Sequence, residues 1–212
     1  MRRLARAIAV VMTSLLTMTP VTGCTDQDDP RIPQHPKEGD GWSGMSLPHR
    51  RAGQPAIFDS IYLCIDRPGS IKIVDVSMEY TDGGFFVEAF ATRPAVPPAG
   101  VTYPSPVTES ETLWDLGYRQ GDANIDTPCT QGMESTPTEH RTQVGVQFSK
   151  PTDKTARGAL LRITYRSGDN TYSYRMGFEA VLCETEQSKP ECVAWDYDWT
   201  KEPVRIINSA AP

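Results

Sequence analysis

The sequence predicts an all-β fold, an antiparallel two-sheet sandwich that is immunoglobulin-like in the broad sense. From residue 57 onward, apolar residues of the 212-residue chain recur at every second position, which is the period of half-buried strands. Short clusters of Gly, Pro, Asp and Asn separate these segments, as is typical of sandwiches. Helical periodicity is nearly missing. We therefore expect one β-sandwich domain at residues 56–207 and a tail at 208–212.

The first half of this domain contains three expected strands, at 58–65, 71–80 and 85–92. The turn sequences Asp-Arg-Pro-Gly (66–69) and Thr-Asp-Gly-Gly (81–84) separate them. Within the second strand, the apolar positions change phase between Ile73 and Val74. A one-residue change of phase predicts a β-bulge or a bend at that point.

The second half contains expected strands at 143–149, 161–166 and 172–182. The sequence Ser-Gly-Asp-Asn (167–170) should close a hairpin between the last two. Residues 93–141 are rich in Pro and poorly periodic, with at most a short strand or helical turn near 113–118. A connection of that length is uncommon in a compact domain. We expect it either to cover an open sheet edge or to form a binding face.

The first 23 residues have the pattern of a secretory signal. Arg2, Arg3 and Arg6 precede an apolar run at 8–18, which is too short to cross a bilayer. The residues Val21-Thr22-Gly23-Cys24 that follow resemble the lipobox of bacterial lipoproteins. This resemblance implies cleavage before Cys24 and attachment of a diacylglyceryl group to its sulfur, with fatty acyl chains such as palmitate. The alternative is an ordinary secretory signal with Cys24 near the cut.

The order of features along the chain extends the resemblance. A lipobox, a tether, a Cys-bearing strand (LCIDRPGSIKIVDV) and a hairpin ending in LRITYRSGDNTYSYRMGFEAVLC are similar to small envelope lipoproteins of high-GC Gram-positive bacteria. The resemblance implies a lipid-anchored protein on the extracytoplasmic face of the cell membrane. It assigns no functional residue beyond Cys24.

The cysteine count agrees with this placement. Lipidation of Cys24 leaves four of the five cysteines, an even number suited to disulfides in an oxidising compartment. The polar segment ETEQSKPE can turn the chain back, so we expect Cys183 to pair with Cys192, which leaves Cys64 for Cys129. The rival pairing joins Cys64 to Cys183 and Cys129 to Cys192, because Cys64 and Cys183 both lie opposite the apolar faces of their strands.

Residues 24–55 are expected to begin with the lipidated cysteine and to continue as a flexible tether. They are rich in Pro, Gly and charge and show no period, and about 30 such residues reach roughly 30 Å. His35, Met45 and His49 could be offered as a soft-metal site. They lack a regular ligand spacing, and we interpret them as solvated linker residues. We therefore predict no metal and no cofactor.

The charge of the mature chain limits its partners. Removing residues 1–23 leaves 18 Lys+Arg against 27 Asp+Glu, a net charge of −9. An acidic chain is a poor ligand for nucleic acid, so we expect no nucleic-acid partner. The expected partners are the membrane, through the lipid, and an envelope protein or glycan.

Catalytic motifs are missing from the sequence. It contains no nucleophile elbow, no His-Glu-x-x-His and no Cys-x-x-Cys, and His140 is the one histidine of the expected domain. Acidic residues recur from Asp196 onward as at the start of a calcium loop. Lys201 and Ile207 occupy the positions of its glycine and its closing acid, which argues against calcium. We predict no catalytic residue.

The stretch 195–199 is the most distinctive local feature. If it is a strand, Trp195, Tyr197 and Trp199 share one face, where they could stack on a sugar or pack a cationic partner. The simpler interpretation is a final strand that buries them. The leading functional hypothesis is a non-enzymatic, lipid-anchored binding or interaction module of the cell envelope. The alternatives are an envelope glycan hydrolase using Asp196 and Asp198, roughly 7 Å apart on a strand, and a structural lipoprotein.

Overall fold

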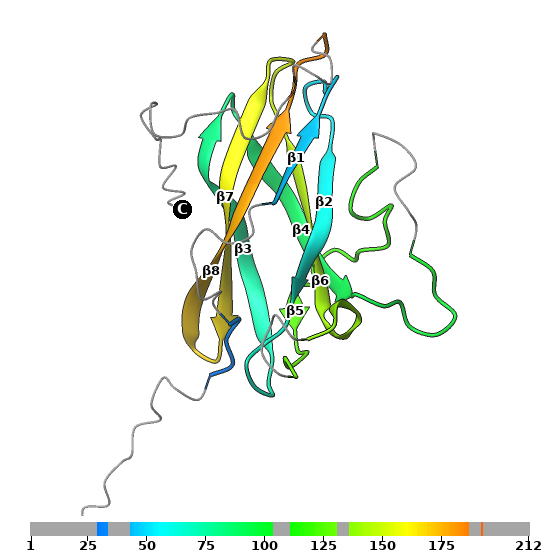
Figure 1. Ribbon diagram of the computed structural model, residues 1–212, viewed down its shortest axis with the longest axis vertical. Coiled ribbons are helices and arrows are strands. Elements are labelled where there is room, and N and C mark those ends of the chain that lie inside the picture. The colour runs from blue at the N-terminus through cyan, green and yellow to red at the C-terminus, as the bar shows by residue number, and fades with distance from the viewer. Residues whose placement is uncertain (1–28, 34–42, 104–110, 131–135, 187–191, 193–212) are drawn as a thin grey trace, which may run out of the picture.

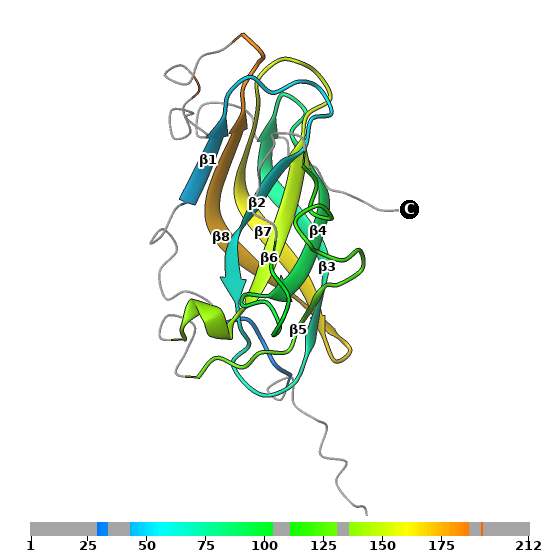
Figure 2. The ribbon, with the colours of Figure 1, turned by 90° about the vertical axis from the view of Figure 1, so that its right-hand side faces the viewer.

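A computed structural model describes residues 29–33, 43–103, 111–130, 136–186 and 192. These residues form two packed β-sheets (Figures 1 and 2), with strand orders β1-β8-β7-β3-β5 and β2-β6-β4. The all-β sandwich predicted from the sequence is confirmed. The elements are β1 (Ser43–Leu47), β2 (Ala56–Leu63), β3 (Ile71–Asp82), β4 (Phe86–Pro94), β5 (Asn124–Ile125), the 3-10 turn η1 (Thr138–His140), β6 (Thr142–Ser149), β7 (Ala156–Ser167) and β8 (Asn170–Leu182).

The alternating segments form the long strands, as expected. Ser167 pairs with Asn170 across the predicted β7–β8 hairpin, and the register of β3 against β7 shifts between Ile73 and Asp75, at the predicted bulge. One pairing differs from the antiparallel expectation, because β1 runs parallel to β8. The turns at 66–69 and 81–84 each carry the chain from one sheet to the other.

Aromatic side chains fill the space between the sheets. The ring of Phe148 lies 5.1 Å from that of Phe85 and 5.8 Å from that of Phe178. Phe178 in turn lies 4.4 Å from Phe58. These rings come from both sheets, so the sheets are held together by one continuous apolar layer.

Residues 113–118 of the long connection between β4 and β6 pack on the outer face of the three-stranded sheet, which faces the viewer in Figure 2. Leu113, Leu116 and Tyr118 form a second apolar cluster there with Ala91 of β4. Gly145 of β6 makes room for it, since a Cβ at that position would lie 2.6 Å from Leu113 Cδ2 and 2.7 Å from Tyr118 Cζ. This part of the connection therefore covers a sheet face, and residues 113–117 form a turn.

The cysteines pair as expected. Cys64 bonds to Cys129, and Cys183 bonds to Cys192. The bridges lie at opposite ends of the sandwich, because Cys64 follows β2 while Cys183 follows β8. The expectation that Cys64 and Cys183 lie away from the apolar side chains is wrong, since both are fully buried. Each follows the last residue of its strand, where the alternation no longer determines the direction of the side chain.

The predicted tether over residues 24–55 is wrong for its described parts. Ile32 is 1% exposed and belongs to the main core, and β1 adds a strand to the larger sheet. Met45 and Leu47 of β1 pack against that core. The strand has only five residues, and its stability depends on backbone pairing with β8, which needs no apolar alternation. The domain therefore starts before residue 56.

Raising the pH above about 10 is expected to lower the free energy of unfolding. Burial raises the pKa of Tyr118, Tyr165 and Tyr174, that of Tyr174 to about 12. Such a phenol stays protonated in the folded chain while the unfolded chain ionises, so its stabilising contribution is lost as the pH rises through the folded pKa. Urea denaturation at about pH 9 and about pH 12 measures the difference.

Lys150 has the opposite effect on how the free energy of unfolding changes with pH. Its Nζ donates to the carbonyl oxygens of Asp153, Lys154 and Cys183, and burial lowers its pKa. Burying the charged ammonium group therefore lowers the free energy of unfolding below that pKa. This unfavourable contribution is lost as the pH rises toward about 10.5. Because the three buried tyrosines outnumber this one lysine, the free energy of unfolding is still expected to fall as the pH rises. Tyr174→Phe should make the loss smaller, and an equal loss in both proteins would contradict the assignment to buried tyrosines.

Candidate functional site

An open groove lies between the edges of β3 and β4, where the two sheets meet. It has a volume of about 370 Å³. We call it the β3–β4 groove. Its lining residues are Asp75 and Val76 of β3, Val87, Glu88, Ala89 and Phe90 of β4, and Trp114, Gln120 and Gly121 of the connection.

Two β-bulges meet at this groove. The register of β3 shifts between Ile73 and Asp75, and that of β4 shifts between Val87 and Ala89. Bulges change the direction of side chains and are enriched next to functional sites. Here they accompany two exposed carboxylates, Asp75 of β3 and Glu88 of β4.

Trp114 is presented by a tightly hydrogen-bonded turn. The backbone N–H and the hydroxyl of Thr112 donate to Oδ2 of Asp115, at 2.8 and 2.7 Å. These bonds hold the pKa of the Asp115 carboxyl below its ordinary value. The buried Leu113 and Leu116 fix the turn on the sheet, while the Trp114 side chain between them stays 39% exposed.

Gln147 of β6 connects this turn to the groove. Its Oε1 accepts a hydrogen bond from the N–H of Leu113 at 3.1 Å, and its Nε2 donates to Oε2 of Glu88 at 2.6 Å. One buried amide therefore sets the position of both the Trp114 turn and the Glu88 carboxylate. A site supported in this way needs little rearrangement to bind a ligand.

Arg93 of β4 fixes the other end of the turn. Its guanidinium lies 3.9 Å from the ring centre of Tyr103 and 4.1 Å from that of Tyr118. It also donates to the carbonyl oxygen of Leu116 and pairs with Asp59. The turn is thus anchored on both sides of Trp114, through Leu113 and through Leu116.

The groove combines an exposed indole with hydrogen-bonding groups. Asp75 and Glu88 can accept hydrogen bonds, and the Gln120 amide can both donate and accept. The volume lies at the lower end of the range for small-ligand sites, of about 300–1,000 Å³. The arrangement suits a small polar ring with one apolar face, or a cation beside the indole.

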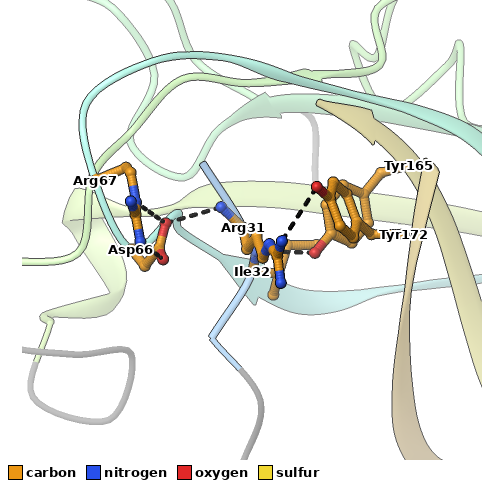
Figure 3. A network of polar contacts seen from close by, with 6 residues as sticks. All are labelled: Arg31, Ile32, Asp66, Arg67, Tyr165 and Tyr172. Carbon is orange, nitrogen blue, oxygen red and sulfur yellow. Dashed lines mark hydrogen bonds and ion pairs between the residues drawn. The ribbon is translucent and has the colours of Figure 1, made fainter. Parts of the chain in front are cut away.

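A second cluster of polar contacts holds residues 29–33, which we call the amino-terminal clip (Figure 3). The N–H of Arg31 donates to Oδ1 of Asp66, and the N–H of Asp66 donates back to the carbonyl oxygen of Arg31, both at 2.8 Å. The N–H of Ile32 donates to the buried Tyr165 hydroxyl at 3.2 Å. The clip is thereby fixed to the end of the sandwich.

Most of the residues singled out in the sequence lie outside the described ranges. This applies to Cys24, His35, Trp195, Asp196, Tyr197, Asp198 and Trp199. Met45 packs against the core, and Nδ1 of His49 lies 2.7 Å from the carbonyl oxygen of Thr185. Within the described ranges, no three His, Cys, Asp or Glu side chains are grouped as a metal site would require.

The groove was not predicted from the sequence, although the sequence contains two of its signals. The phase change at Val74 predicts a β-bulge or a bend, but the sequence does not reveal that it lies near a second irregularity at Glu88. Trp114 is the one tryptophan in the 93–141 connection, a position where an aromatic residue is either packed or displayed. Its partner Gln147 comes from a distant strand, so sequence spacing could not connect the two.

The comparisons with known proteins add no relative. No family model, curated protein or solved structure matches the chain. In the described part of the chain, no helix has the length and apolar character needed to span a bilayer.

Proposed function

We propose that this chain is a lipid-anchored binding module on the extracytoplasmic face of a bacterial cell membrane, and that it binds an envelope glycan in the β3–β4 groove. The observation that carries the proposal is Trp114, held exposed beside Glu88 by a turn that is anchored on both sides. The anchor itself rests on the lipobox-like residues before Cys24.

The chemistry of the groove favours a glycan. The face of a pyranose ring that carries axial C–H groups is apolar and packs on a flat indole, while its hydroxyls need hydrogen-bond partners at the edge. Asp75, Glu88 and Gln120 supply such partners around Trp114. The volume of about 370 Å³ suits one or two sugar units.

The disulfides support the proposed extracytoplasmic location. All four cysteines after Cys24 are bonded in two pairs. Disulfides of this kind persist in oxidising surroundings and are rare in the cytosol of most organisms.

Replacing Trp114 with alanine is expected to weaken glycan binding about tenfold, because a stacked indole contributes about 1.4 kcal/mol. Binding of purified cell-wall glycan fragments to the detergent-solubilised protein, measured by calorimetry, tests this. Phe86→Ala is the matched control, because Phe86 is an aromatic residue of β4 that is 44% exposed and does not line the groove.

Three results would count against the proposal. Equal binding by Trp114→Ala and the parent chain would remove the groove as the site. An equal loss in Phe86→Ala would point to a general effect on the sheet. Binding of cationic peptides alone, abolished by salt, would replace the glycan with a cationic ligand.

A further inference from the structure

We infer that the amino-terminal clip holds the domain in one orientation on the membrane, with the end formed by the β2–β3 and β7–β8 turns facing the bilayer surface. The inference rests on the lipidation of Cys24, which is part of the proposed function. It concerns a property that lipidation alone does not supply, since a lipid on a long tether leaves a domain free to rotate.

The centre of the clip is built into the core. Ile32 is almost fully buried in the main apolar cluster, and its N–H donates to the hydroxyl of Tyr165, which is itself buried in β7. Full burial of an isoleucine side chain is worth about 1.5–3 kcal/mol. The preceding Pro30 lies close to the turn after β2, since a Cβ at Gly69 would be 2.8 Å from Pro30 Cγ.

Arg31 adds contacts to the β2–β3 turn and to the start of β8. Its backbone exchanges the two reciprocal hydrogen bonds with Asp66, ahead of β3. Its guanidinium lies 4.4 Å from the ring centre of Tyr172 and donates to the Tyr172 hydroxyl at 3.2 Å. Figure 3 shows Arg31 between these two partners, so the clip joins the β2–β3 turn to the start of β8.

Asp29, the first described residue, is held at the start of β8. Its Oδ2 accepts hydrogen bonds from Nδ2 of Asn170 at 2.9 Å and from the hydroxyl of Tyr172 at 3.3 Å. Both donors lie at the start of β8, directly after the hairpin turn. In Figure 1 the clip is the dark blue segment beside that turn.

Chain length then limits the distance to the membrane. Five residue steps separate Cys24 from Asp29, and a fully extended chain covers at most about 18 Å in that number of steps. A strand of the 13 residues of β8 is about 40 Å long. The connection to the lipid is therefore less than half as long as the sandwich, so the clip end stays near the surface and an inverted orientation, with the Cys183–Cys192 end nearest the bilayer, is out of reach.

The orientation also places the β3–β4 groove. Asp75 lies four residues along β3 from its start at the clip end, which corresponds to about 13 Å. Together with the connection to the lipid, this keeps the groove within about 30 Å of the bilayer. The ligand expected there is a glycan close to the membrane.

Energy transfer in vesicles tests the orientation. The lipidated protein is inserted into phosphatidylglycerol–phosphatidylethanolamine vesicles that carry an acceptor dye on the lipid headgroup. A donor dye is attached either at Asp169→Cys, in the exposed β7–β8 turn, or at Thr152→Cys, an exposed position between β6 and β7 at the opposite end. Transfer is expected to be several-fold stronger from position 169.

A linker variant provides the matched control. About 20 Gly and Ser residues inserted between Thr25 and Asp26 leave the clip intact and allow a reach of roughly 27 Å, with a much longer extended length. The difference between the two donor positions should then largely disappear.

Three outcomes separate the claims. Equal transfer from both positions in the parent chain, or stronger transfer from position 152, would overturn the orientation if mass spectrometry shows acylated Cys24. A persistent difference in the linker variant would also overturn it, because the orientation would then not depend on the short connection. An unmodified Cys24 would instead overturn the anchoring on which the inference rests.

Discussion

Replacing Phe148 with alanine is expected to lower the free energy of unfolding by about 3–5 kcal/mol. Phe148 is fully buried on β6, the central strand of the smaller sheet, and its ring contacts Phe85 and Phe178. Because Phe178 belongs to the larger sheet, the truncation removes a contact between the sheets and leaves a cavity that rigid strands cannot close. Guanidinium denaturation followed by circular dichroism measures the loss.

Phe86→Ala is the matched control for this prediction. It removes the same side chain from β4, at a position that is 44% exposed and precedes Val87, which packs against the core. The expected change is within about 0.5 kcal/mol, as for most surface substitutions. Equal losses in the two variants would show that the aromatic layer between the sheets is not the main source of the stability difference.

The long strands could be predicted because the pattern that indicates each strand lies within its own residues. Alternating apolar side chains define β6, β7 and β8, and Gly168 adopts a φ of 56°, which glycine tolerates in the hairpin turn. The bulge at Val74 could be predicted for the same reason, since one inserted residue reverses the phase of every later side chain.

The clip and β1 could not be predicted in this way. Ile32 is one apolar residue among Pro, Asp and Arg, and composition alone indicates a linker. Its burial depends on Tyr165, which lies 133 residues further along the chain. Strand β1 is stabilised by backbone hydrogen bonds to β8, and these do not depend on the side chains that sequence patterns reveal.

The candidate site could not be predicted from the sequence for a similar reason. The groove depends on Gln147, whose amide joins Leu113 to Glu88 across 34 and 59 residues of sequence. Such a contact requires the pairing of β4 with β6 and the folding of the connection over it. The aromatic residues Trp195, Tyr197 and Trp199 and the lipid site at Cys24 stay predictions, because they lie outside the described residues.

Removing the long disulfide, with Cys64→Ala and Cys129→Ala together, is expected to lower the free energy of unfolding by about 4 kcal/mol. The bridge spans 65 residues and joins the end of β2 to the segment that follows β5. Without it, the unfolded chain gains the conformational freedom of that whole loop. Because Cys64 is buried in the core, the variant also tests whether packing around its sulfur adds to the effect. Guanidinium denaturation under non-reducing conditions measures the change.

The short bridge supplies the matched control. Cys183 and Cys192 are nine residues apart, and loop-closure entropy assigns their bridge about 2.5 kcal/mol. The double variant Cys183→Ala/Cys192→Ala should therefore lose about 1.5–2 kcal/mol less than the long-bridge variant, a difference set by the ratio of the two loop lengths. Equal losses would mean that native-state packing, and not the freedom of the unfolded chain, determines the effect. A peptide linking Cys64 to Cys183 in a non-reducing digest of the parent protein would contradict the pairing on which both values depend.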